Sequence, residues 1–527
     1  MATEGRVALT RLVGTRARGI ARSVVSELAV VAGLCLLAVT VRIWLALKMP
    51  TPWALIDELI YAELAKSLVE EGEFLVRGVG GFNYGALYPA AIAPAWLAGS
   101  METTYALAKA INVVLMTSVA VPVYLWARKL VAPAFAVVTT ALVLLLPSFV
   151  YTAELLTENL FFPAFVLACF AIARALERPS LLRQALALGA IAIASAVRIQ
   201  GIALVLVLVT AIALNVVLAF RARRERFDVR RLARQFLAFR VSLATLALVA
   251  LGYLALNVVR GQPLSSGLGG YATVVGVDYG LADAVRWIVY HFAELGLAVA
   301  VIPVSALIVL LGLALAGDST SAAERAFVAV AVTATFWLVV QVAVFASRFS
   351  LRIEERNMFY VMPLLFLALA VWIGRGLPRP SRLTTFALLT PAALIVTLPF
   401  ESLLNVAILS DTFAFIPLLR LSTYLPGGVG DVRIAVALGV LAAGLVFAAV
   451  PRPLARVVAP LGIAAFCAMS SYPVFRTIQA YAVPIRATVA GEEPDWIDEA
   501  IGQDAHAAFV FGGSSEIANE ATLLWQT

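Results

Sequence analysis

Two adjacent carboxylates, Asp57 and Glu58, lie in the polar segment that follows the first long apolar run of the chain, residues 48–88. The acidic residues of this segment are Asp57, Glu58, Glu63, Glu70, Glu71 and Glu73. A carboxylate at a membrane boundary, beside a polar cavity, can take a proton from a nucleophilic hydroxyl group and so act as a general base. Alternatively, Asp57 and Glu58 cap a helix and favour its dipole, each by roughly 0.5–1 kcal/mol.

The residues around this pair have the periodicity of an amphipathic helix. The apolar side chains at helical spacing are Ile56, Leu59, Ile60, Leu64 and Leu68. The side chains that fall off this stripe are Asp57, Glu58, Tyr61 and Lys66. Gly72 is a suitable C-terminal stop for the helix. The pattern predicts a helix that lies on the outer membrane face with its acidic N-terminus beside the apolar spans.

A second pair of carboxylates, Glu154 and Glu158, lies in the short segment T-A-E-L-L-T-E-N-L. Residues four apart share one face of a helix, so the two carboxylates are predicted to point the same way. One interpretation is a pair of ordinary solvated loop carboxylates. The other is a second acidic site that orients either the acceptor or the base.

Arg198 interrupts an apolar stretch that otherwise runs from Ala185 to Ala219. An arginine at membrane depth is costly and usually faces a cavity or an anion. If residues 184–197 and 201–220 form two spans, Arg198 instead lies in a tight turn at the outer interface. In both cases it faces the outer side, where a guanidinium group can bind a phosphate through two hydrogen bonds.

Arg352 and Arg356 are also four residues apart and precede another apolar run. With Glu355 they could form a local ion-pair network. The functional alternative is that Arg356 binds a phosphate group, whose negative charge a fixed cation stabilises. Lys66 is a secondary candidate for the same contact. Arg42, near the outer end of the first span, is predicted to extend its charge to the interface.

Histidine and tyrosine residues supply weaker candidates. His291 lies in R-W-I-V-Y-H-F-A-E, where it either packs in an interface or contacts a substrate. Tyr84 and Tyr88 in N-Y-G-A-L-Y-P could stack on a sugar ring, although aromatic residues are common at the interfaces of any membrane protein.

Composition identifies the elements that must position these residues. Of the 527 residues, 62% are hydrophobic and only 13% are charged, whereas a soluble chain carries about 25% charged residues. Apolar runs of about 20 residues cross a hydrocarbon core of roughly 30 Å, and only helices satisfy the backbone there. About thirteen spans are predicted: 26–47, 104–127, 132–151, 159–176, 184–197, 201–220, 239–258, 296–316, 326–346, 358–374, 384–400, 432–450 and 457–475.

Charge gives this arrangement a direction. Residues 1–25 contain five arginines and are expected in the cytoplasm. With that start, the strong arginine clusters fall on the inner side, and the loops with Asp57, Glu158 and Glu355 fall on the outer side. Residues 26–475 are therefore predicted to form one transmembrane domain in the cell membrane, with 48–88 as its first outer loop. The net charge of +7 indicates loop topology rather than nucleic-acid binding.

The C-terminal segment, 476–527, has a different pattern. D-W-I-D-E-A-I-G predicts a short helix, and A-A-F-V-F-G-G predicts a strand that enters a glycine turn. This pattern is typical of the opening of a small extracytoplasmic α/β domain, which we expect to be incomplete, either through truncation or as a remnant. The expected fold is thus an all-α polytopic membrane protein with a short α/β segment at its C-terminus.

Several classes of site are excluded or left open. Cys35, Cys169 and Cys467 all fall in apolar runs, which indicates buried thiols rather than a disulfide or a metal cluster. Only two histidines are present, which excludes a histidine-rich metal site. No Walker loop or dinucleotide fingerprint follows a strand. No cofactor is therefore predicted with certainty; the carboxylates suffice for a divalent cation but have no diagnostic spacing.

The order of these motifs resembles a known family. One span is followed by D-E with Tyr61 four residues after Asp57, then by a glycine-rich segment that ends in L-Y-P, a second acidic outer loop and E-R-N-M-F-Y-V-M-P. This resembles the C-type glycosyltransferases (GT-C), in the branch with protein O-mannosyltransferases and bacterial aminoarabinose transferases, over about 26–475. Relatives often have E-R-Y where this chain has E-R-N.

The resemblance implies a hexosyl or pentosyl transferase with a polyprenyl-phosphate sugar as donor, a glycan, lipid or protein as acceptor, and inverting transfer on the extracytoplasmic face. The acid of the first loop, Asp57 or the adjacent Glu58, would be the base. Some relatives use a divalent metal near the acids and others do not. The alternative function is a transporter or flippase of a lipid-linked sugar, which predicts inverted repeats and charges at mid-membrane. The hydropathy pattern has no such repeat, and the charges cluster in the outer loops.

Overall fold

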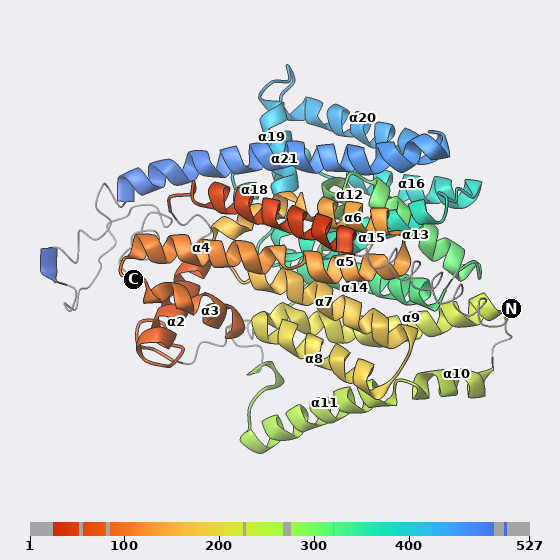
Figure 1. Ribbon diagram of the computed structural model, residues 1–527, viewed down its shortest axis with the longest axis horizontal. Coiled ribbons are helices and arrows are strands. Elements are labelled where there is room, and N and C mark those ends of the chain that lie inside the picture. The colour runs from red at the N-terminus through yellow and green to blue at the C-terminus, as the bar shows by residue number, and fades with distance from the viewer. Residues whose placement is uncertain are drawn as a thin grey trace, which may run out of the picture.

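The computed structural model describes residues 25–51, 56–80, 85–224, 228–266, 274, 276–319, 321–489 and 500–502. Within these ranges every regular element is a helix, apart from one isolated antiparallel bridge between Val76 and Val79. The prediction of an all-α polytopic membrane protein is therefore confirmed. Most of the long helices run side by side along the longest axis of the molecule (Figure 1).

Eight helices among the described residues are long and apolar enough to cross a membrane. They are Val25–Ala46, Met101–Leu130 (α4, Met101–Thr117, and α5, Ala120–Leu130), Glu158–Glu177 (α7), Ile199–Arg223 (η3, Ile199–Ile202, and α9, Ala203–Arg223), Arg240–Arg260 (α11), Ala322–Ala346 (α14), Val429–Ala448 (α20) and Arg452–Ala487 in α21 (Arg452–Val489). Two further spans are formed if each bent pair counts as one. The pairs are α6 (Pro133–Leu144) with η2 (Pro147–Ala153), bent by 53°, and α12 (Leu281–Ala298) with α13 (Ile302–Leu315), bent by 110°.

The predicted count of about thirteen spans is not confirmed. Three of the predicted spans form shorter apolar helices, Leu181–Val197 (α8), Phe359–Gly374 (η6, Phe359–Val361, and α15, Met362–Gly374) and Ser381–Val396 (α16). A helix of 16 or 17 residues is only about 25 Å long, less than the roughly 30 Å of a hydrocarbon core. The side chains of α15 are almost all buried within the protein, so its apolar character serves internal packing.

The centre of the bundle is formed by α7, α14 and α15, and the first span, α11 and α20 are mostly exposed at its surface (Figure 1). Aromatic rings join α7 to η6. The ring centroids of Phe162 and Phe359 are 5.0 Å apart, and those of Phe161 and Tyr360 are 4.8 Å apart. This packing anchors the segment that directly follows Arg356.

The helix α2 (Ile56–Glu70) forms where the sequence predicts it, and the chain turns at Gly72 with φ of 76°. Its buried face differs from the prediction. Glu58 and Tyr61 are buried, whereas Leu59 and Ile60 of the predicted apolar stripe are only half-buried. The helix packs against α3 (Leu87–Ile92) and η1 (Ala93–Leu97). The helix is therefore part of the protein core. Glu58 has polar partners there, which favours burial of the helix face that carries Glu58 and Tyr61.

A segment of short helices, residues 400–422, follows α16, and we call it the covering segment. It consists of α17 (Phe400–Leu403), α18 (Ile408–Asp411), η7 (Phe413–Phe415) and α19 (Ile416–Ser422). Two of its polar groups bond to the segment around Arg356: Thr412 Oγ1 donates to the Ile353 carbonyl at 2.6 Å, and the Ala414 N–H donates to Glu355 Oε2 at 2.7 Å. Residues 400–422 therefore hold that segment in place.

The remaining helix, α10 (Val229–Leu237), lies beyond α9 at the end of the molecule opposite to α2 (Figure 1). The C-terminal helix α21 continues past residue 475, where the last span was predicted to end, as far as Val489. The predicted α/β segment lies outside the described residues except for 476–489 and 500–502.

Candidate active site

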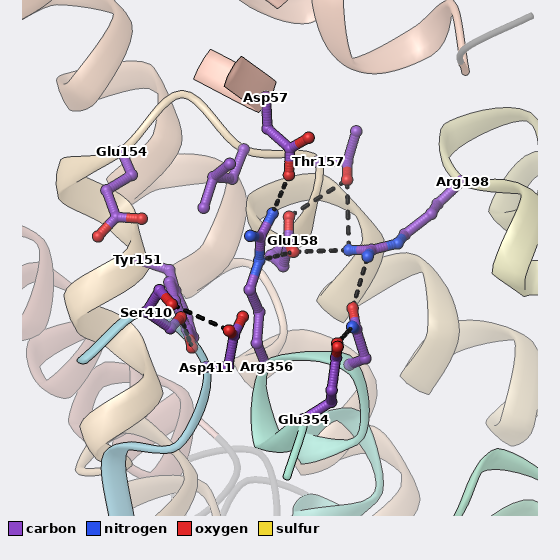
Figure 2. Close-up of polar contacts among 12 residues, drawn as sticks. Asp57, Tyr151, Glu154, Thr157, Glu158, Arg198, Glu354, Arg356, Ser410 and Asp411 are labelled. Carbon is purple, nitrogen blue, oxygen red and sulfur yellow. Dashed lines mark hydrogen bonds and ion pairs between the residues drawn. The ribbon is translucent and has the colours of Figure 1, made fainter. Parts of the chain in front are cut away.

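Arg356 is the centre of the candidate site. It lies in the short helix η5 (Glu355–Asn357) and is 7% exposed. Its Nη2 donates to Asp57 Oδ2 at 2.7 Å, and its Nε donates to Glu158 Oε1 at 2.5 Å (Figure 2). Burial lowers the pKa of Arg356, but the charges of Glu158 and Asp57 outweigh burial and hold the pKa above its ordinary value. One arginine thus joins two acids that are 101 residues apart in the chain.

Arg198 approaches Glu158 from the other side. Its Nη1 lies 2.6 Å from Glu158 Oε1, and its Nη2 donates to Asn357 Oδ1 at 2.5 Å. Tyr360 accepts a further bond from Nη1 at 3.2 Å. Arg198 has extended backbone between α8 and η3, so the interpretation as a tight turn between two helices is the correct one.

Glu158 is fully buried at the first position of α7. It forms ion pairs with Arg198 and Arg356, and its Oε2 accepts a hydrogen bond from the Thr157 hydroxyl group at 3.2 Å. A buried carboxylate needs such partners to offset its desolvation. Glu158 therefore holds both arginines at fixed positions.

Asp57 differs from Glu158 in its exposure. Its side chain is 44% exposed, although Arg356 beside it is only 8% exposed. Asp57 is the second residue of α2, so its carboxylate also lies at the positive end of the helix dipole. It is the acid of this site that a substrate can reach from solvent.

Glu58 has a different environment from its neighbour. It is fully buried and accepts hydrogen bonds from the Leu155 N–H at 2.9 Å and the Tyr105 hydroxyl at 3.3 Å. These bonds fix the start of α2 to α4 and to the segment between η2 and α7. The geometry therefore gives Glu58 a role in positioning Asp57.

The sequence spacing predicted that Glu154 and Glu158 share one face of a helix, and this prediction is wrong. Glu154 ends the 3₁₀ helix η2, and an irregular segment separates it from α7. Its side chain is 2% exposed, and Oε2 has no hydrogen-bond partner among the described residues. Burial and then the charge of Glu58 raise the pKa of Glu154 well above its ordinary range. A protonated Glu154 would be a hydrogen-bond donor.

Arg352 does not join Arg356 at the centre of the site. It pairs with Asp411 of α18, with 2.7 Å between Nε and Oδ2. Ser410 Oγ donates to the same carboxylate oxygen at 2.9 Å. Burial, together with the charge of Glu354, raises the pKa of Asp411 to about 6. Arg352 therefore fixes the covering segment next to the site.

His291 is fully buried on α12. Its Nδ1 lies 2.8 Å from the Trp287 carbonyl, and its Nε2 accepts from the Glu354 N–H at 3.2 Å. These partners require a neutral ring with the proton on Nδ1. Packing, one of the two interpretations from the sequence, describes this residue.

The other predicted contacts are more distant from the centre. Tyr61 is buried and packs edge to face on Tyr88, with centroids 5.4 Å apart. Lys66 lies 4.0 Å from Glu70 on the surface of α2. Tyr84 lies outside the described residues. Arg42 is buried over the Phe149 ring, 5.3 Å from its centroid, rather than extended to the interface, so that expectation is wrong.

A mostly apolar cavity of about 510 Å³ opens next to Arg198. Arg198, Gln200 and Asn357 line its polar part. Leu206, Trp337 and Phe345 are among the residues that line its apolar part, between α9 and α14. The cavity therefore has a guanidinium group and amide groups in one part of its lining and apolar side chains in most of the rest.

Several residues of the site were not identified from the sequence. Asp411 lies in a long loop without any motif, and only its contact with Arg352 identifies it. Asn357 and Tyr360 belong to the E-R-N-M-F-Y motif, but their bonds to Arg198 depend on the approach of α8. Among the described residues no group of three or more His, Cys, Asp or Glu side chains is arranged to hold a metal ion.

Comparison with known proteins gives matches at the level of structure. No protein-family profile and no curated protein matches the sequence. The structure is similar to ArnT from Cupriavidus metallidurans bound to undecaprenyl phosphate, with 16% identity, a TM-score of 0.49, and coverage of 94% of this chain and 84% of that one. The apo state of the same ArnT matches with 14% identity, a TM-score of 0.45 and the same coverage.

Proposed function

We propose that this protein is a membrane glycosyltransferase that moves a sugar from a polyprenyl-phosphate donor to an acceptor on the extracytoplasmic face, with inversion at the anomeric carbon. The observation that carries the proposal is the pair of arginines, Arg198 and Arg356, held together by Glu158 where a mostly apolar cavity begins. A donor made of a phosphate and a long apolar chain has the same two parts. Undecaprenyl phosphate, the ligand of the similar ArnT structure, is a lipid of this kind.

In this proposal the donor phosphate binds the guanidinium groups of Arg198 and Arg356, with its prenyl chain along Leu206, Trp337 and Phe345. Guanidinium groups suit phosphate oxygens because they donate two parallel hydrogen bonds. As the bond between the anomeric carbon and the phosphate oxygen breaks, negative charge grows on the phosphate. Fixed cations stabilise that charge and so lower the barrier.

Asp57 supplies the base. Its ion pair with Arg356 holds a carboxylate beside the proposed phosphate site. A bound phosphate competes for the same guanidinium group, which frees Asp57 to accept the proton of the acceptor hydroxyl as its oxygen attacks the anomeric carbon. Because the donor is already activated by its phosphate, this reaction needs no nucleotide.

The test is a transfer assay on the purified protein in liposomes, with a radiolabelled polyprenyl-phosphate sugar and candidate acceptors. We expect Asp57→Asn to lower the rate by about 10²–10⁴-fold, the usual effect of removing a general base. Asp283→Asn is the matched control, because Asp283 is an exposed aspartate in an ion pair with Arg286, and it should keep the wild-type rate.

Full transfer by Asp57→Asn would refute the assignment of the base. Movement of the labelled lipid between leaflets without any transfer to acceptors would refute the proposal as a whole and favour a flippase instead. The identity of the acceptor follows from the same assay when glycan, lipid and protein acceptors are compared.

A further inference from the structure

A second pair of buried acids lies behind Arg356. Glu294 of α12 is fully buried, and Glu355 of η5 is 3% exposed. The helix η5 packs against α12, and the two carboxyl groups interact with each other there. Neither carboxylate oxygen of Glu294 receives a hydrogen bond from any donor among the described residues. Glu355 has one backbone donor, the Ala414 N–H.

This contact has a simple chemical requirement. An ionised carboxylate only accepts hydrogen bonds, so two carboxyl groups can bond to each other only if one of them carries a proton. Two buried negative charges without that proton would repel each other at low local dielectric. Burial raises the pKa of Glu355 to about 7, while its bonds with Ala414 and Glu294 lower it.

The other groups around the pair do not neutralise it. The titratable side chains on the elements that pack there are His291 on α12, Glu354 and Arg356 beside the pair, Tyr360 on η6, Asp411 on α18 and Tyr151 on η2. His291 is neutral in its observed bonds, and Arg356 is paired with Glu158 and Asp57. Glu324 of α14 is paired with Arg375. The charged residue of α16, Arg382, lies in the first turn of that helix, whereas Gly296 of α12 packs near its other end.

We infer that Glu294 is a positioning residue, which shares one proton with Glu355 and thereby holds η5, with Arg356, against α12. Glu355 directly precedes Arg356, so repulsion between the two acids would move the guanidinium group away from Asp57 and Glu158. The inference rests on the proposed function for its activity readout. The proton itself can be detected without any activity.

The first measurement is the pH dependence of transfer. In the wild type we expect the rate to fall at least about fivefold between about pH 7 and pH 9 as the shared proton is lost. In Glu294→Gln the amide group donates the same hydrogen bond to Glu355 at every pH, so the alkaline fall should be absent. Glu355→Gln should remove the fall in the same way, since it also leaves one donor in the pair.

The matched control is Glu102→Gln, which removes the charge of an exposed glutamate on α4. It should keep the wild-type pH profile. An alkaline fall in Glu294→Gln equal to that of the wild type would overturn the inference, as would a profile that changes equally in Glu102→Gln.

The second measurement is infrared difference spectroscopy of the wild type and Glu294→Gln at neutral pH. A band of a buried protonated carboxyl group should be present in the wild type and lost in the variant. Absence of that band in the wild type would overturn the inference even if the variants fail to fold. If the band is present in the wild type and lost in Glu294→Gln, but the wild type transfers no sugar to any acceptor, the shared proton stands and the proposed function fails.

Discussion

Asp57 and Glu58 are adjacent in the chain, but only Asp57 has the exposure that a base needs. Glu58 is fully buried and bonded to Leu155 and Tyr105. The two residues point in directions about 100° apart because they follow each other on a helix. The sequence could not choose between them, since both acids fit the family motif. Packing of α2 against the core separates their roles.

This separation makes a prediction at the residue scale. Glu58→Ala should lower the free energy of unfolding by about 1–3 kcal/mol, because it leaves the buried Leu155 N–H without an acceptor. Glu58→Gln keeps an acceptor oxygen and should retain most of both stability and activity. Asp57→Asn should instead lose activity with little change in stability. Thermal unfolding in detergent and the transfer assay measure the two effects; a greater loss of transfer in stable Glu58→Gln than in Asp57→Asn would reverse the assignment.

At the scale of elements, close approaches of the backbone decide where the arginines lie. A Cβ atom on Gly85 would lie 2.1 Å from the carbonyl oxygen of Val197 at the end of α8, directly before Arg198. The backbone at Gly85 therefore approaches the turn at Arg198 more closely than any side chain allows. The sequence showed glycine at this position but not what it packs against, because Gly85 and Val197 are 112 residues apart.

We therefore expect Gly85→Ala to displace the end of α8. Overpacking of this kind costs about 1–3 kcal/mol, and the shift of Arg198 should raise the KM for the donor. Gly189→Ala is the control on the same helix, since nothing lies within 4 Å of its added Cβ atom; it should stabilise α8 by about 0.5–1 kcal/mol. Thermal unfolding and donor titration test both variants, and a Gly85→Ala protein with wild-type values would contradict this account.

At the scale of the whole molecule, one end of the protein holds α2, the turn at Arg198 and the end of α21. Arg486 near the end of α21 pairs with Glu102 at the start of α4, with 3.0 Å between Nη2 and Oε1. The helix α10, with its arginines, lies at the opposite end (Figure 1). This separation of acidic and basic ends agrees with the proposed orientation, in which the site is extracytoplasmic.

Labelling with a membrane-impermeant thiol reagent tests this orientation in intact cells. Glu70→Cys on α2 and Arg231→Cys on α10 change residues whose side chains are each 56% exposed. We expect labelling of the first variant only, and labelling of both after the cells are permeabilised. Wild-type protein gives the background from Cys35, Cys169 and Cys467. Labelling of the α10 variant from outside would invert the proposed orientation.

The sequence by itself determined the class of the fold and the helix that carries Asp57, and it predicted most of the charged residues of the candidate site. It could do so because hydropathy over about 20 residues and the spacing of helix signals are local properties. The tertiary structure decided the pairing of Arg356 with Asp57 and Glu158, the buried role of Glu58, the place of Asp411 and the contact between Glu294 and Glu355. These contacts join residues that are tens to hundreds of positions apart, and the cost of burying each charge is met only by partners that the packing of the helices brings together.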